Sequence, residues 1–543
     1  MLRALLILCS LGVALISRPA DACGCFAPTT VVSPVVQAGE RILFAVRDGK
    51  VIAHIQIQYV GDAQNFGWLL PLPSVPTMKA GSEELFERLL EETTPVYTTQ
   101  GNVKCRPITF GCASFARTAG TSVEEDAGTG PVVSQGSVGP YEFAVLSAAN
   151  KDEMLRWLND NRFFIPTGTQ SAVDPYINPG AYFLALKLQS GRTAGDIAPI
   201  VLEYESSYPM IPLVLTSVGA TPNMGVQVWL LGNGRGIPRN YAHVVLNDAV
   251  LDWASGVPNY ADVITRAVGE APNKHAFVTE YAGPSAPLLL DETRFATENE
   301  LAITTGPDAF ISALKQRRFG RNGELPTPLV RVIATELPVP PALVAKGITE
   351  AEWVDRLGSY LGDYRDQNPD DFMGYTATFD APRLAARVFA DYVKPIRDGF
   401  ALFAEFPKLT RLVTTLNPED MTADPVFAFN ASLPDVSHRH TGVQDFGCGT
   451  VTDITTEQGW MFKANADRSG LPAALSIANV PEEGQPVILT NNVNVVAKRF
   501  PLKEGSPLTS QVGCSASPLA LFSLAAVFAF TRRRRVTSRA ESA

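Results

Sequence analysis

The sequence has 543 residues, of which 46% are hydrophobic and 18% charged, and its formal net charge at pH 7 is −10. An acidic surface disfavours nucleic acid and anionic lipid headgroups as partners. The length allows two to four domains or one large core with insertions, and the abundant glycine and proline favour short strands and turns over a helical bundle.

The first 22 residues have the pattern of a secretory signal peptide. Arg3 precedes an apolar stretch over residues 4–16, and Ala20-Asp21-Ala22 forms a small-x-small cleavage pattern. We therefore expect cleavage after Ala22 and an exported chain that begins at Cys23. Lipidation of this cysteine is the alternative, although the residues before it fit a lipoprotein signal poorly.

Residues 41–60 have the pattern of a β-hairpin. Two apolar runs flank Asp48-Gly49, a pair typical of two-residue primed turns. After the turn, polar and apolar residues alternate, which puts the odd-numbered residues of 55–59 on the buried face. By the same alternation, we expect His54 on the solvent-exposed face.

A mainly antiparallel β-sheet core with peripheral helices, an α+β fold, is predicted from the segments that follow. Residues 82–92 form an amphipathic helix with Ser82 as its N-cap, residues 151–161 form a second helix, and residues 117–138 form an exposed linker. The glycine-rich stretch 232–236 lacks the Lys-Ser/Thr of a phosphate-binding loop, so we interpret it as a turn. Further strands are expected at Tyr182–Leu188, Ile200–Tyr204, Ile211–Leu215 and Gly225–Leu231.

The second half of the chain contains a helical segment before strands return. Helices are expected at Asp308–Arg317, Thr349–Tyr364 and Pro382–Phe403, strands and turns at Lys408–Asn430, and one more strand at Val487–Val496. The predicted division is a signal peptide at 1–22, a β-rich region at 23–305, a helical region at 306–405, a strand-rich region at 406–502, a spacer at 503–513, a transmembrane span at 514–531 and a basic cytoplasmic tail at 532–543.

The C-terminal tail predicts one transmembrane helix. Residues 514–531 would form about 27 Å of helix, close to the roughly 30 Å hydrocarbon core of a bilayer. Arg532, Arg533, Arg534 and Arg535 follow directly and orient the C-terminus toward the cytoplasm. The order of Gly513-Cys514, apolar span and arginine cluster also resembles the myxobacterial-type C-terminal sorting signal, which implies processing near Cys514 and delivery to the cell surface.

Five cysteines remain outside the leader and the tail, so one stays unpaired within the chain. Export favours disulfides over thiols. We expect Cys105 to pair with Cys112 and Cys25 to pair with Cys448. A metal site is the alternative use of these cysteines, but no CxxC pair or matching histidine spacing supports it.

The chain has five histidines, and His438 with His440 forms their only cluster. On a strand these two side chains would share a face, as two metal ligands require, but a third ligand cannot be named. No nucleophile-elbow or zinc-protease motif is present, and no cofactor is implied. A catalytic site, if there is one, must be assembled from residues far apart in the sequence.

Several segments, in this order along the chain, together resemble an uncharacterised bacterial exported family, domain of unknown function 2330. The resemblance implies an envelope protein with a signal peptide and a C-terminal anchor, and it assigns no activity, catalytic residue or cofactor. The segments are Cys23–Phe26, Ala53–Tyr59, Phe66–Pro73, Phe277–Gly283, Leu409–Leu412 and Asp424–Phe427.

The sequence therefore predicts an exported protein of the cell envelope with a binding or structural role and no catalysis. It is tethered to the membrane by its C-terminal span or sorted to the surface. An envelope hydrolase or metal-dependent enzyme is the alternative. A carrier or sensor that works with other envelope proteins is a third hypothesis.

Overall fold

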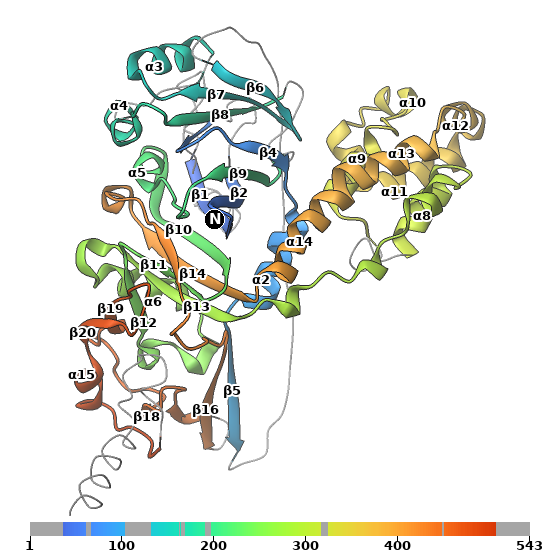
Figure 1. Cartoon of the computed structure of the whole chain (residues 1–543). Helices are drawn as coiled ribbons and strands as arrows, with labels where there is room; N and C mark the ends of the chain where they lie inside the picture. The colour runs from blue at the N-terminus through green and yellow to red at the C-terminus, as the bar shows by residue number, and fades with distance from the viewer. Residues whose placement is uncertain are drawn as a thin grey trace, which may run out of the picture.

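A ten-stranded mixed sheet forms the centre of the molecule (Figure 1). The computed structural model describes residues 36–60, 67–103, 132–161, 163, 169–189, 197–316, 324–447 and 450–505. The strand order is β20-β19-β12-β13-β14-β10-β1-β2-β9-β4. These strands are β1 (Val36–Arg47), β2 (Lys50–Val60), β4 (Thr77–Ala80), β9 (Ile200–Glu205), β10 (Ala220–Gly232), β12 (Ala242–Leu246), β13 (Ala276–Pro284), β14 (Lys408–Leu416), β19 (Ala474–Asn479) and β20 (Val487–Asn491).

Most neighbouring strands of this sheet are antiparallel, but β1–β10 and β12–β13 are parallel. The prediction of an α+β fold is confirmed, and the sheet is mixed rather than purely antiparallel. The hairpin β1–β2 is confirmed as well, because Asp48 and Gly49 have φ angles of 53° and 76°, as a primed turn requires.

Two smaller four-stranded sheets and one two-stranded sheet complete the β structure. The first has the order β3-β8-β7-β6, the second β18-β17-β16-β5, and β5 and β16 are parallel. Their strands are β3 (Gly67–Leu72), β5 (Val96–Val103), β6 (Val132–Val138), β7 (Tyr141–Ser147), β8 (Tyr182–Leu188), β16 (Arg439–Gly447), β17 (Thr450–Thr455) and β18 (Met461–Lys463), with the pair β11 (Arg235–Pro238) and β15 (Phe427–Asn430) separate.

A helical arm projects from one side of the body (Figure 1). It contains α8 to α13, and a π-helical turn at Phe389–Val393 joins α13 to α14, which runs back to α2 on the body. The helices described are α2 (Glu83–Thr93), α3 (Lys151–Asp160), α4 (Thr169–Ala172), α5 (Leu213–Thr216), α6 (Tyr260–Gly269), α7 (Glu298–Ala302), α8 (Pro307–Gln316), α9 (Thr327–Ala334), α10 (Pro341–Val344), α11 (Glu350–Gln367), α12 (Pro369–Thr376), α13 (Ala381–Val388), α14 (Lys394–Glu405) and α15 (Val493–Ala497).

Both faces of the central strands of the large sheet are buried, which gives the molecule two main apolar cores. On β1, Ile42 and Phe44 belong to one core and Leu43 and Ala45 to the other. The second core continues into the helical arm. The predicted exposure of His54 is wrong for this reason, because its side chain is only 2% exposed on the face that α2 and α14 cover.

Three further predictions need correction or lie outside the described residues. Residues 211–215 do not form a strand, because Pro212 cannot donate to a sheet ladder and the short helix α5 starts directly after it. Residues 132–138 of the predicted linker form strand β6. The structure describes no helix that is long and apolar enough to cross a bilayer, and the predicted span at 514–531 lies beyond the residues it describes.

Candidate functional site: a polar cavity between two sheets

A cavity of about 170 Å³ lies where β12 and β13 of the large sheet meet β5 and β16. One part of its wall is apolar, with Val245, Val278 and Leu475 among the side chains. The rest is polar and comes from elements far apart in the sequence. The polar residues are Tyr97, Arg235, His243, Asp248, Tyr260, Thr279, Glu280, His440, Glu457 and Gln458.

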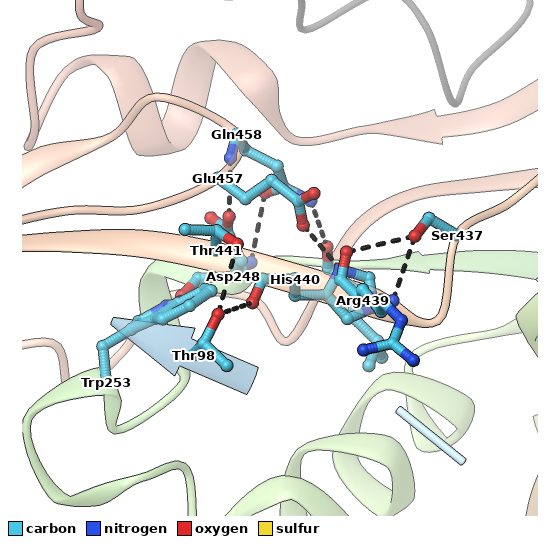
Figure 2. A network of polar contacts seen from close by, with 10 residues as sticks. Thr98, Asp248, Trp253, Ser437, Arg439, His440, Thr441, Glu457 and Gln458 are labelled. Carbon is cyan, nitrogen blue, oxygen red and sulfur yellow. Dashed lines mark hydrogen bonds and ion pairs between the residues drawn. The ribbon is translucent and has the colours of Figure 1, made fainter. Parts of the chain in front are cut away.

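His440 is held on β16 in a fixed orientation (Figure 2). Its Nδ1 lies 2.5 Å from Oε2 of Glu457, and its ring stacks on Tyr97 with the centroids 4.6 Å apart. Tyr97 is opposite His440 in the parallel register of β5 and β16, so the strand pairing itself creates the stack. No protein partner is found for Nε2 of His440 in the part of the chain that the structure describes.

Asp248 is a buried carboxyl group beside this pair. Its Oδ2 accepts a hydrogen bond of 2.7 Å from the backbone N–H of Gln458, and its own N–H donates to Oε1 of Gln458 at 3.1 Å. Figure 2 shows how this exchange joins Asp248 to the segment that carries Glu457. Burial raises the pKa of Asp248 to about 7, so this group can gain or lose a proton near neutral pH.

Two residues of the wall, Tyr260 and Glu280, belong to a buried chain of polar groups that continues behind the wall to Arg411 and Thr94. The hydroxyl of Tyr260 donates to Oε1 of Glu280 at 2.9 Å, and Oε2 of Glu280 lies 2.7 Å from Nε of Arg411. Nη1 of Arg411 donates to Oγ1 of Thr94 at 2.7 Å. Burial raises the pKa of Glu280, and the charge of Arg411 opposes this shift. The ion pair is almost fully desolvated, so loss of either member would leave an unpaired buried charge.

Arg235, His243 and Thr279 form the remaining polar part. Nη2 of Arg235 lies 3.1 Å from Nε2 of His243 and donates to Oγ1 of Thr279 at 2.9 Å. Because a guanidinium can only donate, Nε2 of His243 must be unprotonated. Burial and the neighbouring guanidinium both lower the pKa of His243, to about 3, which agrees with a neutral ring. Burial also lowers the pKa of Arg235, to about 10, and leaves it charged at neutral pH.

Local sequence explains how Arg235 reaches this place. It follows the tight turn between β10 and β11, in which a Cβ on Gly234 would come within 2.8 Å of the backbone of Ala431. A Cβ on Gly236 would lie 2.5 Å from the side chain of Leu230. Glycine at both positions lets β11 lie close to β10 and to the end of β15. In this arrangement the side chain of Arg235 is buried.

The two histidines singled out from the sequence have different places. His440 lines the cavity, whereas His438 precedes β16 and lies against the edge of Tyr281, with ring centroids 5.5 Å apart. Within the described ranges, no three His, Cys, Asp or Glu side chains lie close enough together to hold a metal ion. The processing and disulfide candidates lie outside those ranges and stay predictions: Ala22, Cys25, Cys105, Cys112, Cys448, Cys514 and Arg532–Arg535.

Sequence reasoning missed most of the charged residues of the site. The signal for two of them was a charge in the middle of an apolar strand, namely Glu280 in Phe277–Gly283 and Arg411 in Leu409–Leu412. Charges are rarely fully buried unless they are paired, so two such strands predict an ion pair between them. Arg235 gave no such signal, because its glycine-rich surroundings are typical of a turn.

Comparison with known proteins gives one family. A family model described as "Uncharacterized protein conserved in bacteria (DUF2330)" matches residues 19–325, more than half of the chain. No curated protein and no solved structure matches the chain.

Proposed function

Since the chain belongs to the DUF2330 family of proteins conserved in bacteria, we propose that it is an exported envelope protein that binds a small polar molecule in the cavity between β12–β13 and β5–β16. The protein is tethered to the membrane by residues 514–531 or sorted to the cell surface. The same proposal includes other envelope proteins as partners and a small polar molecule as the ligand.

The observation that carries the binding role is the collection of buried polar groups around one cavity. The side chains of Arg235, Asp248 and Glu280 are each less than 9% exposed, and all three line the cavity. Burial of charged groups is costly, and a core built for stability alone avoids it. Small-molecule sites have this composition, with an apolar wall and a few convergent polar groups.

The support for export comes from the two ends of the sequence. The N-terminus has a leader with a small-x-small cleavage pattern, and the C-terminus has an apolar run followed by four arginines. Both features support a location of most of the chain outside the cytoplasm. The cysteine content and the acidic net charge fit this location.

Ligand binding can be tested by thermal unfolding of the full-length protein in detergent with a library of organic acids, amino acids and sugars. A true ligand at a hundredfold excess over its Kd should stabilise the protein by about 2.7 kcal/mol. Val245→Phe fills the cavity and should abolish the shift, whereas Val487→Phe, at a position 61% exposed on β20, should preserve it. Equal shifts in both variants would exclude the cavity as the binding site.

A second candidate is an envelope hydrolase, and the pairing of His440 with Glu457 favours it. A carboxylate on Nδ1 leaves Nε2 as the basic nitrogen, which could take a proton from a water molecule that attacks a bound carbonyl group. His440→Gln should then abolish turnover of the ligand found in the thermal screen and leave its affinity within about threefold. If no ligand of the wild-type protein is turned over, the binding role stands alone.

A further inference from the structure

We propose that the molecule bound in the cavity carries a single carboxylate group, for which Arg235 is the partner. This inference rests on the proposed binding function and adds the chemical class of the ligand. Its basis is the state of the guanidinium group, which is buried and charged and has no carboxylate partner in the described part of the chain.

The hydrogen-bond donors of the Arg235 guanidinium are only partly satisfied by the described residues. The residue is 7% exposed. Its Nη1 donates weakly to the carbonyl of Pro434 at 3.4 Å, its Nη2 reaches His243 and Thr279, and its Nε has no acceptor within the described ranges. All of these acceptors are neutral, because His243 is unprotonated.

The acidic side chains around Arg235 do not neutralise it. Asp435 raises the pKa of Arg235 through space, but its carboxylate forms an ion pair with Lys408 on the surface. Glu280 is likewise engaged, with Arg411 and Tyr260. A buried charge without a partner of opposite sign is among the most unfavourable arrangements in a protein interior. Arg235 lines the cavity, so an anion bound there would supply the missing charge.

The other side chains of the cavity limit the charge and shape of this anion. The carboxyl groups of Asp248, Glu280 and Glu457 line the same space and would repel a dianion such as hydrogen phosphate about twice as strongly as a monoanion. A carboxylate carries one charge, and its planar shape matches a guanidinium. The same acidic groups accept hydrogen bonds, so the rest of the ligand should carry a hydroxyl or ammonium group. Short hydroxy acids and amino acids meet both conditions.

Calorimetric titration of the full-length protein in detergent can test this with matched pairs of probes, each an acid and its primary amide. Lactate with lactamide and alanine with alaninamide are the first pairs. In the wild type, the acid should bind at least about tenfold more tightly than the amide, because a hydrogen bond to a charged partner is lost in the amide. Arg235→Gln should reduce this ratio to near one. Arg239→Gln is the matched control, since it removes an arginine charge from an exposed position outside the cavity, and it should keep the wild-type ratio.

The stability of the unliganded variants separates ligand recognition from a purely structural role. If Arg235 only holds the loop at Pro434, Arg235→Gln should lower the denaturant midpoint and leave the acid preference intact, which would overturn the proposal. If it serves a ligand, removal of an unpaired charge should leave the midpoint unchanged or raise it. Should Arg235→Gln fail to fold, Thr279→Val provides the second variant, and it should reduce the acid preference because it loosens the guanidinium.

The failure of this inference differs from the failure of the proposed function. Acid and amide that bind equally well to the wild type, and not to Val245→Phe, would preserve the binding cavity and exclude the role of Arg235. An absence of binding by every probe to the wild type would count against both.

Discussion

His54 links the stability of this protein to pH. Its side chain is buried against α2 and α14, and its Nδ1 has no hydrogen-bond partner among the residues that the structure describes. Burial lowers its pKa from 6.5 to about 4. Between these two values the unfolded chain binds a proton that the folded chain does not, so the folded state loses stability as the pH falls from 6.5 to 4.

Replacement of His54 by leucine should remove this loss. The lowered pKa costs the folded state about 3 kcal/mol at pH 4, as an upper bound, because a tenfold change in proton affinity corresponds to about 1.4 kcal/mol. Urea unfolding of both proteins at pH 8 and at pH 4 measures it, and the values at pH 8 serve as the control because the imidazole is neutral there in both states. Parallel losses of stability in the two proteins would contradict this account.

For single residues, the sequence predicted the face of a strand on which a side chain lies better than it predicted what covers that face. The alternation at residues 55–58 correctly separated the two faces of β2, but it could not show that helices from residues 83 and 394 onward cover the second face. His440 is a candidate from the sequence because it forms, with His438, the only histidine cluster. Its partner Glu457 could not be, since the two residues meet only through the pairing of β16 and β17.

Among the elements, the N-terminus of α11 allows a test of how a capping box stabilises a helix. It begins with a capping box, in which Oγ1 of Thr349 accepts from the N–H of Glu352 and the carboxylate of Glu352 accepts from the N–H of Thr349. Thr349→Ala should destabilise the helix by about 1 kcal/mol. Faster amide hydrogen exchange in the first turn of α11 would measure the loss. Thr378→Ala is the control: this exposed threonine lies just after the end of α12, where its Oγ1 donates to the carbonyl of Tyr375, and its loss should leave exchange in the first turn of α11 like the wild type.

Helices and strand pairs differ in how far the sequence could predict them. The predicted helices at 151–161, 308–317 and 349–364 agree with α3, α8 and α11 within a few residues, because caps and apolar periodicity are local signals. The parallel pairs β1–β10 and β5–β16 join residues that are far apart in the chain, and no local pattern encodes them. The cavity depends on the second of these pairs, so its existence could not be predicted.

For the whole molecule, the central prediction is its place in the cell. In an expressing bacterium, the protein should fractionate with the envelope, and protease added outside an intact inner membrane should digest it. Mass spectrometry of the purified protein should find a new N-terminus at Cys23 and, if the sorting signal acts, a C-terminus near Cys514. A soluble cytoplasmic protein that begins at Met1 would refute export, and an intact Arg532–Ala543 would reduce the tail to an ordinary membrane anchor.

The position of β14 has a consequence for how the chain is made. This strand, at residues 408–416, lies between β10 and β13 and is hydrogen-bonded to both. While a ribosome is still adding the residues before 408, those two strands have no common neighbour and their buried faces stay open. The central sheet therefore cannot close until late in synthesis. Because β14 lies in the last quarter of the chain, we expect the apolar faces of β10 and β13 to be prone to aggregation until that quarter is made.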